Sequence, residues 1–262
     1  MKAPSRSWIT RYGVGAALVA MSIAAAIAAP GFFSLANAST IMLHVSINGI
    51  LTLGMTFVII TAGIDLSVGS LLGLAGVLVA GALTAPGLIA AVGVGGAAVV
   101  ATLIGLAVGA AVGVANGALT AFLGINPFIV TLAMMTVARG AARLVTGGVP
   151  IGFPPMGDPH FAQKVAALDA LHAFGGGRIP IPGTGQGFPV PALVMLALVF
   201  LSAVVLDRTR FGRYVYAVGG NEEAARLSGV PVRGVKVGVY AIAGACRVGG
   251  RAHGGPAAVR RS

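Results

Sequence analysis

Between Tyr12 and Ala138 the chain carries no lysine or arginine, and Asp65 is the only acidic residue there. A soluble domain needs a charged surface and has on average about 25% charged residues. This chain of 262 residues has 9% charged and 57% hydrophobic residues, so it cannot cover a globular surface. The sequence therefore predicts an all-α, polytopic bundle of transmembrane helices in a lipid bilayer.

A helix needs about 20 apolar residues to cross the hydrocarbon core, and this length defines about six complete spans and a partial seventh. The expected spans are 13–35, 41–62, 68–84, 88–115, 127–145 and 191–206, and the partial seventh is 235–245. The first apolar run is longer than the roughly 15 residues of a signal-peptide core. We therefore expect it to remain as an uncleaved span.

The net charge of +11 lies mainly at the two ends of the chain. Basic residues near a span are retained on the cytoplasmic side, whereas nucleic-acid binding would require a basic patch on a folded surface. We expect a cytoplasmic N-terminus at 1–12, a membrane domain at 13–206, an external loop at about 147–189 and a cytoplasmic loop at 207–234. The proline-rich external loop is expected to be irregular, and no nucleic-acid partner is expected.

Small residues recur every four positions along the fourth expected span. They are Gly93, Ala97, Ala101, Gly105, Gly109, Gly113 and Gly117. This spacing places them on one helix face, where small side chains allow two helix backbones to approach closely. The pattern favours a packing face over a simple consequence of Ala- and Gly-rich composition.

Polar residues inside apolar spans are expensive and are the first candidates for function. Asp65 could cap or turn the helix that starts near Val68, which is the favoured interpretation, or could line a substrate pathway or pair with another group. Arg139 could reach the outer interface or face a polar cavity. Asn126, Thr131 and Thr136 could bind a hydroxylated substrate, although hydrogen bonding between helices is the more common role for each of them.

Three stretches carry a family resemblance. Residues 59–70 read IITAGIDLSVGS, residues 126–132 read NPFIVTL, and residues 212–230 read GRYVYAVGGNEEAARLSGV. In order and spacing they closely resemble the ribose-type monosaccharide permeases of bacterial ABC importers. The resemblance implies a multi-pass permease of the inner (plasma) membrane that moves a sugar into the cell.

The resemblance also implies partners: a separate ABC ATPase, a periplasmic sugar-binding protein and a second permease copy. The segment implied to contact the ATPase comprises Gly220, Asn221, Glu222, Glu223, Ala224, Ala225, Arg226, Leu227 and Ser228. Asn221 can cap a short helix there and Gly229 can end it, and the apolar Ala224, Ala225 and Leu227 would fill a groove in the partner. The chain has no phosphate-binding G-x-x-x-x-G-K-[ST] motif, so no enzymatic activity, cofactor or metal is expected.

Two other functions stay open from the residues alone. One is a secondary transporter that uses Asp65 and the arginines for ion or proton coupling, and the other is an inactive truncated permease or membrane scaffold. The resemblance stops near Gly244, where Cys246, Arg247 and a basic Gly/Arg tail replace the apolar continuation. We expect a frameshift or truncation near Ala245 and an aberrant tail at 246–262 that stays in the cytoplasm, because burying Arg247 would be costly.

Overall fold

A computed structural model describes residues 6–149 and 157–252. The helices are α1 (Arg6–Ala28), α2 (Leu35–Ile60), α3 (Val68–Leu83), α4 (Pro86–Phe122), α5 (Pro127–Thr146), α6 (Phe161–Gly176), α7 (Val190–Arg208), α8 (Arg210–Gly220), α9 (Glu222–Leu227) and α10 (Val232–Ala252). A short antiparallel hairpin, β1 (Arg178–Pro180) and β2 (Gly187–Pro189), precedes α7. The predicted all-α class is confirmed.

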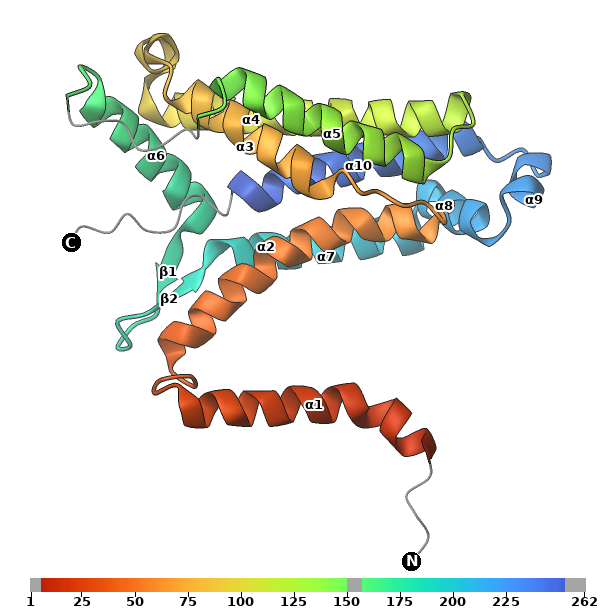
Figure 1. Cartoon of the computed structure of the whole chain (residues 1–262), viewed down its shortest axis with the longest axis horizontal. Helices are drawn as coiled ribbons and strands as arrows, with labels where there is room; N and C mark the ends of the chain where they lie inside the picture. The colour runs from red at the N-terminus through yellow and green to blue at the C-terminus, as the bar shows by residue number, and fades with distance from the viewer. Residues whose placement is uncertain (1–5, 150–156, 253–262) are drawn as a thin grey trace, which may run out of the picture.

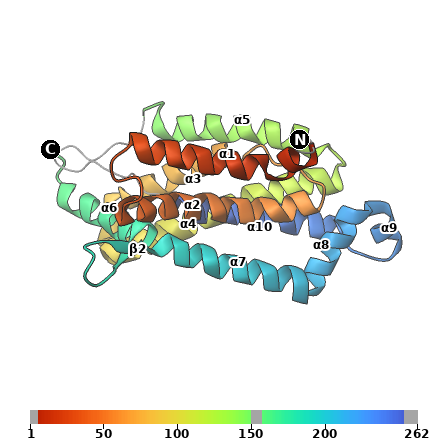
Figure 2. The ribbon, with the colours of Figure 1, turned by 90° about the horizontal axis from the view of Figure 1, so that it is seen from below.

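The helices α2, α3, α4, α5, α7 and α10 run side by side, α1 lies apart from them, and the connections gather at two opposite ends (Figures 1 and 2). One end holds the start of α1 together with α8 and α9, and the other holds α6 and the hairpin. Within the described residues, α2, α4, α5 and α7 are long and apolar enough to cross a membrane, while Tyr12–Ala28 and α3 are shorter apolar helices. The predicted set of about six apolar spans is thus present as helices, and two of them are short.

The boundary between the first two spans differs from the expected one. The first helix ends at Ala28, and Gly31 adopts the left-handed φ of +87° that few residues other than glycine tolerate. Ser34 then caps α2 by accepting a hydrogen bond of 3.2 Å from the Asn37 backbone N–H. A helix cap therefore starts the second span six residues before the position that hydropathy predicted.

The C-terminal part of the small-residue stripe of α4 lies against α10, whereas Gly93, with φ +70°, is exposed at a break in the helix. A Cβ on Gly117 would stand 2.7 Å from the Cα of Val237, and a Cβ on Gly113 would overlap the carbonyl oxygen of Tyr240. The contact is reciprocal, since a Cβ on Gly244 would overlap the carbonyl oxygen of Gly109. These glycines let the two backbones touch, while Gly105 is buried on the same face.

The seventh apolar segment is longer than the sequence indicated. Where 235–245 was expected, α10 has 21 residues and is about 31 Å long, close to the roughly 30 Å of the hydrocarbon core. It packs along α4 and α2, and its Val239, Tyr240 and Ala243 are fully buried. The helix therefore passes the expected boundary at Ala245 and includes Arg247.

The expectation of an irregular external loop at 147–189 is wrong for its second half. The residues between Pro159 and Pro180 are free of proline, and they form α6 and the first strand of the hairpin. Ala167 and Leu171, one helical turn apart, are buried against α3 and α4. A local apolar repeat thus forms a helix that the overall proline and glycine content concealed.

The first turn of α6 is held by Asp158. Its carboxylate accepts a hydrogen bond of 2.6 Å from Lys164 Nζ and one of 2.8 Å from the His160 backbone N–H. The Lys164 hydrogen bond, followed by the one from His160, holds the pKa of Asp158 below its ordinary value of 3.8. A lowered pKa means that this contribution to stability is complete above the ordinary pKa and is lost as the pH falls through the pKa of the folded state.

We expect the first turn of α6 to open more readily below about pH 4. Amide hydrogen exchange of residues 161–164, corrected for its intrinsic pH dependence, measures this opening. An Asp158→Asn variant should show the acid level of exchange at every pH. Equal pH dependence in the two proteins would contradict the assignment.

Candidate functional site

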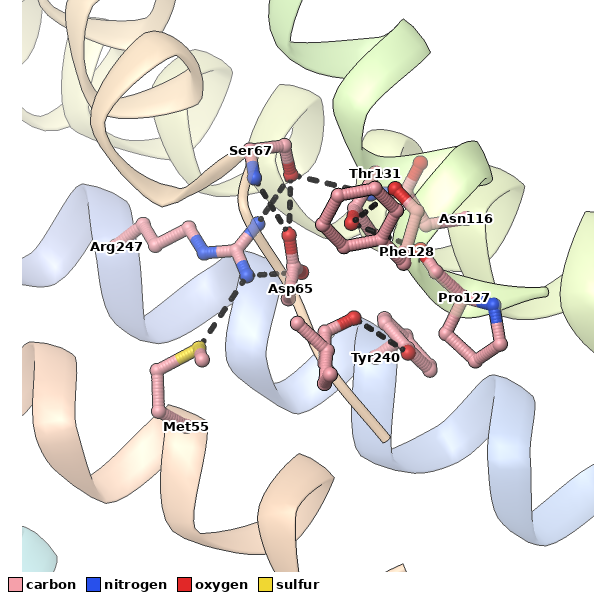
Figure 3. A network of polar contacts seen from close by, with 10 residues as sticks. Met55, Asp65, Ser67, Asn116, Pro127, Phe128, Thr131, Tyr240 and Arg247 are labelled. Carbon is pink, nitrogen blue, oxygen red and sulfur yellow. Dashed lines mark hydrogen bonds and ion pairs between the residues drawn. The ribbon is translucent and has the colours of Figure 1, made fainter. Parts of the chain in front are cut away.

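Two groups of polar side chains in the described chain contain the functional candidates. The first is the buried polar network, which we define as Asp65, Ser67, Asn116 and Arg247, inside the helix bundle (Figure 3). The second is the α8–α9 segment at one end of the bundle (Figure 1). The sequence predicted Asp65 and the α9 residues, but it did not predict Asn116 or Arg247 as neighbours of Asp65.

The end of α2 positions Asp65. The Gly63 backbone N–H donates to the Val58 carbonyl at 2.9 Å, and the Ala62 backbone N–H donates to the Ile59 carbonyl at 2.9 Å. These are the two hydrogen bonds of a Schellman cap. Ala62 occupies the left-handed position with φ +56°, which costs a residue with a Cβ on the order of 1 kcal/mol. This stop leaves an extended stretch that carries Asp65 into the bundle before α3 begins.

Asp65 makes both a turn and an ion pair. Its Oδ1 accepts from the Ser67 backbone N–H at 2.9 Å and from the Ser67 hydroxyl at 2.6 Å. Its Oδ2 accepts from the guanidinium of Arg247, which reaches it from α10. Asp65 therefore forms the turn that the sequence favoured, and it is also paired with another group, which was one of the alternatives.

Ser67 joins three helices at this point. Its hydroxyl oxygen accepts from Arg247 Nη1 at 3.2 Å and from Asn116 Nδ2 of α4 at 3.2 Å. Close by, the Tyr240 hydroxyl donates to the Ile64 carbonyl at 3.0 Å. The extended stretch between α2 and α3 is thus tied to both α4 and α10.

Arg247 lies where the sequence did not place it. It was expected in a cytoplasmic tail, yet its side chain is 1% exposed and that of Asp65 is 0% exposed. The desolvation cost that argued against burying Arg247 is offset because its charge is paired with that of Asp65 and both side chains form hydrogen bonds with Ser67. Asp65, whose favoured role was to cap or turn the start of α3, is likewise inside the bundle.

The other candidate pathway residues do not converge with Asp65. Asn126 caps α5 by accepting from the Phe128 N–H at 2.9 Å, and Thr131 donates to the Pro127 carbonyl at 2.8 Å. Thr136 donates to the Ala133 carbonyl at 2.7 Å, and the exposed Arg139 donates from Nε to Ser70 at 3.1 Å. Each thus has a local or interhelical partner, and only Thr131 lies beside the buried polar network (Figure 3).

The α9 helix forms where the sequence predicted a short capped helix. The Asn221 side chain accepts a hydrogen bond of 2.9 Å from the Ala224 N–H, and Gly229, with φ +80°, follows the last turn. Lys236 of α10 forms an ion pair of 2.7 Å with Glu222. The cap and the ion pair fix α9 to the start of α10.

Only part of the expected contact surface on α9 faces outward. Ala225 is 5% exposed and belongs to the apolar core that α2, α8 and α10 share, so its expected role in filling a partner's groove is wrong. Leu227 is 82% exposed, and Ala224 and Glu223 are exposed beside it. The surface that α9 presents is therefore Glu223, Ala224, Arg226 and Leu227.

A groove of about 810 Å³ lies next to α9. The end of α4, the connection to α5 and the first residue of α5, together residues 120–127, form one wall. Glu222, Arg226 and the start of α10 form the other. The guanidinium of Arg233 stacks on the Phe122 ring at 5.6 Å. An exposed helix thus lies beside a charged groove at this end of the bundle.

Apolar helices that connect the two ends of a bundle define a multi-pass membrane protein, and here a short capped helix projects from one end. The chain belongs to the family described as the branched-chain amino acid transport system permease component, whose model matches residues 37–247. The predicted relation to permeases is thereby confirmed.

The similar proteins include sugar permeases. The chain is 42% identical over 82% of its length to the ribose import permease of Bacillus subtilis strain 168, and it covers 59% of that protein. The chain is 38% identical over 92% of its length to the ribose import permease of Escherichia coli K12, and it covers 67% of that protein. It is 35% identical over 91% of its length to the L-arabinose transport system permease of the same strain, and it covers 64% of that protein. The chain thus spans about 60% to two thirds of the length of these relatives. No solved structure matches it.

Proposed function

We propose that the chain is the membrane-spanning subunit of an ABC importer for a monosaccharide of the ribose type, and that a separate ATPase drives it. The relatives named for ribose and arabinose import support the substrate class. The observation that carries the proposal is the exposed, rigidly held α9 helix at one end of the bundle. A short helix anchored by a cap and an ion pair can transmit a push from a partner into α10.

The orientation belongs to the same proposal. The α8–α9 end and the N-terminus lie in the cytoplasm, and the α6–hairpin end lies in the periplasm, where a sugar-binding protein docks. The basic residues from Arg208 to Lys236 support this orientation through the positive-inside rule. A second copy of the chain completes the pathway as a homodimer, and lipid surrounds the exposed apolar faces.

An ion-coupled transporter has weaker support. A coupling carboxylate must exchange its ion with solvent, whereas the Asp65 side chain is buried and paired with Arg247. An inactive scaffold differs from the importer only in transport. Uptake of labelled ribose therefore separates the scaffold from the importer, and co-purification with an ATPase separates the ion-coupled transporter from it.

The docking test replaces Leu227 by glutamate. A charge at the centre of an apolar contact must be desolvated without a partner, so we expect the amount of co-purified ATPase to fall about tenfold. The chain is co-expressed with the ABC ATPase encoded in the same genome, and the ratio of the two subunits is measured after purification. Ala225→Glu is unsuitable because Ala225 is part of the core.

Ile179→Glu serves as the matched control. Ile179 is also an exposed apolar residue, but it lies in β1 at the opposite end of the bundle. Its replacement should leave the subunit ratio unchanged. Equal losses in both variants, or an ATPase that does not co-purify with the unaltered chain, would contradict the proposal.

A further inference from the structure

We propose that the corner between α7 and α8 is a binding site for the headgroup of an anionic phospholipid, formed by Arg208, Arg210 and Arg213. This role does not depend on transport. It rests on the position of the corner relative to the bilayer, on the exposure of the three arginines and on the absence of a protein partner for their charges among the described residues.

The length of α7 places the corner at the bilayer surface. The helix has 19 residues and is about 28 Å long, close to the thickness of the hydrocarbon core. Its exposed side carries large apolar residues along its whole length, namely Leu193, Leu196, Val199, Phe200, Leu201 and Val204. Charges that begin at Asp207 and Arg208 therefore lie at the level of the lipid headgroups.

Helix α8 is fixed with its basic face outward. Val215 and Val218 are buried in the core that α8 shares with α2 and α10. A Cβ on Gly212 would overlap the Leu206 carbonyl oxygen, so α7 and α8 are in direct backbone contact. Arg210 and Arg213, one turn apart, are exposed on the other side of α8.

The charges at this corner lack a counterion in the described protein. Arg226 and Lys236 form ion pairs with Glu222 and Glu223, whereas none of the three corner arginines forms an ion pair with a described residue. The neighbouring Asp207 is exposed and reduces the local charge from +3 to +2. Guanidinium groups bind phosphate oxygens in a two-pronged geometry, which an anionic headgroup at this depth supplies.

Tyr216 supports the placement of the α7–α8 corner at the bilayer surface. It is 50% exposed on α8, and tyrosines concentrate at the membrane–water interface because the ring is apolar and the hydroxyl is polar. A lipid matches this combination of apolar surface on α7, aromatic ring and basic headgroup contact. An acidic surface of a protein partner would match only the arginines.

The experiment measures binding of phosphatidylglycerol and phosphatidylcholine to the purified full chain by native mass spectrometry. The unaltered chain should bind phosphatidylglycerol more tightly, and Arg210→Gln/Arg213→Gln should weaken that binding by about tenfold to thirtyfold. Arg143→Gln/Arg178→Gln removes the same net charge from exposed positions at the other end and should have no effect. Excess inorganic phosphate should not displace the lipid, because the site includes the apolar surface of α7.

Several results would overturn the proposal. They are equal affinity for the two lipids, equal loss in the control variant, or displacement by inorganic phosphate alone. Retained lipid binding with loss of a co-purified protein would assign the arginines to a protein contact instead. If the double variant does not fold, protection of the 210–220 amides from hydrogen exchange by phosphatidylglycerol in the unaltered chain decides, and no protection rejects the site.

Discussion

Replacing Asp65 by asparagine is expected to destabilise the folded chain by about 3–5 kcal/mol. The substitution keeps the shape and an oxygen that can accept from the Ser67 N–H, but it leaves the Arg247 guanidinium charged and 1% exposed. Removing one member of a buried ion pair costs much more than the pair itself contributes, because the remaining charge stays desolvated. Denaturant unfolding of the purified chain in micelles, followed by circular dichroism, measures the loss.

The complementary variants test whether the ion pair causes the loss. Arg247→Met, which removes the cation at similar volume, should also destabilise the chain, since it strands the Asp65 carboxylate. The double variant Asp65→Asn/Arg247→Met should be more stable than the sum of the single effects predicts, by about 2 kcal/mol. Additive effects would mean that the two charges do not depend on each other.

Replacing Gly113 by valine is expected to cost about 3 kcal/mol, at the upper end of overpacking effects. A Cβ at Gly113 would overlap the Tyr240 carbonyl oxygen. It would also lie 2.9 Å from the Tyr240 carbonyl carbon and 3.0 Å from the Cα of Ala241. Backbone atoms cannot move aside as a side chain does, so α10 must shift away from α4. That shift strains the Tyr240–Ile64 hydrogen bond and the Asp65–Arg247 pair.

Gly95→Val on the same helix is the control. No atom lies within 4 Å of a Cβ at Gly95, so valine there should be neutral or slightly stabilising through its better helix propensity. The same unfolding measurement compares the two variants. A Gly113→Val protein as stable as the Gly95→Val protein would contradict the close approach of α4 and α10.

Local sequence signals predicted the short helix at Glu222–Leu227, because Asn221 and Gly229 act within a few residues of its ends. They failed for Ala225, since the direction in which a six-residue helix points depends on what it packs against. They failed also for α6, where a proline-rich average concealed a helical repeat at Ala167 and Leu171.

The sequence by itself determined that the chain is an all-α membrane protein, since uncharged apolar runs of sufficient length leave no soluble alternative. It also determined which α4 residues could form a close contact, because a four-residue spacing defines one helix face. The tertiary structure alone decided that α10 fills this contact and that Arg247 meets Asp65. Those partners are 182 residues apart in the chain, and no local rule relates two charges at that distance. Only the packing of α10 on α4 and α2 brings them together and makes the burial of both charges possible.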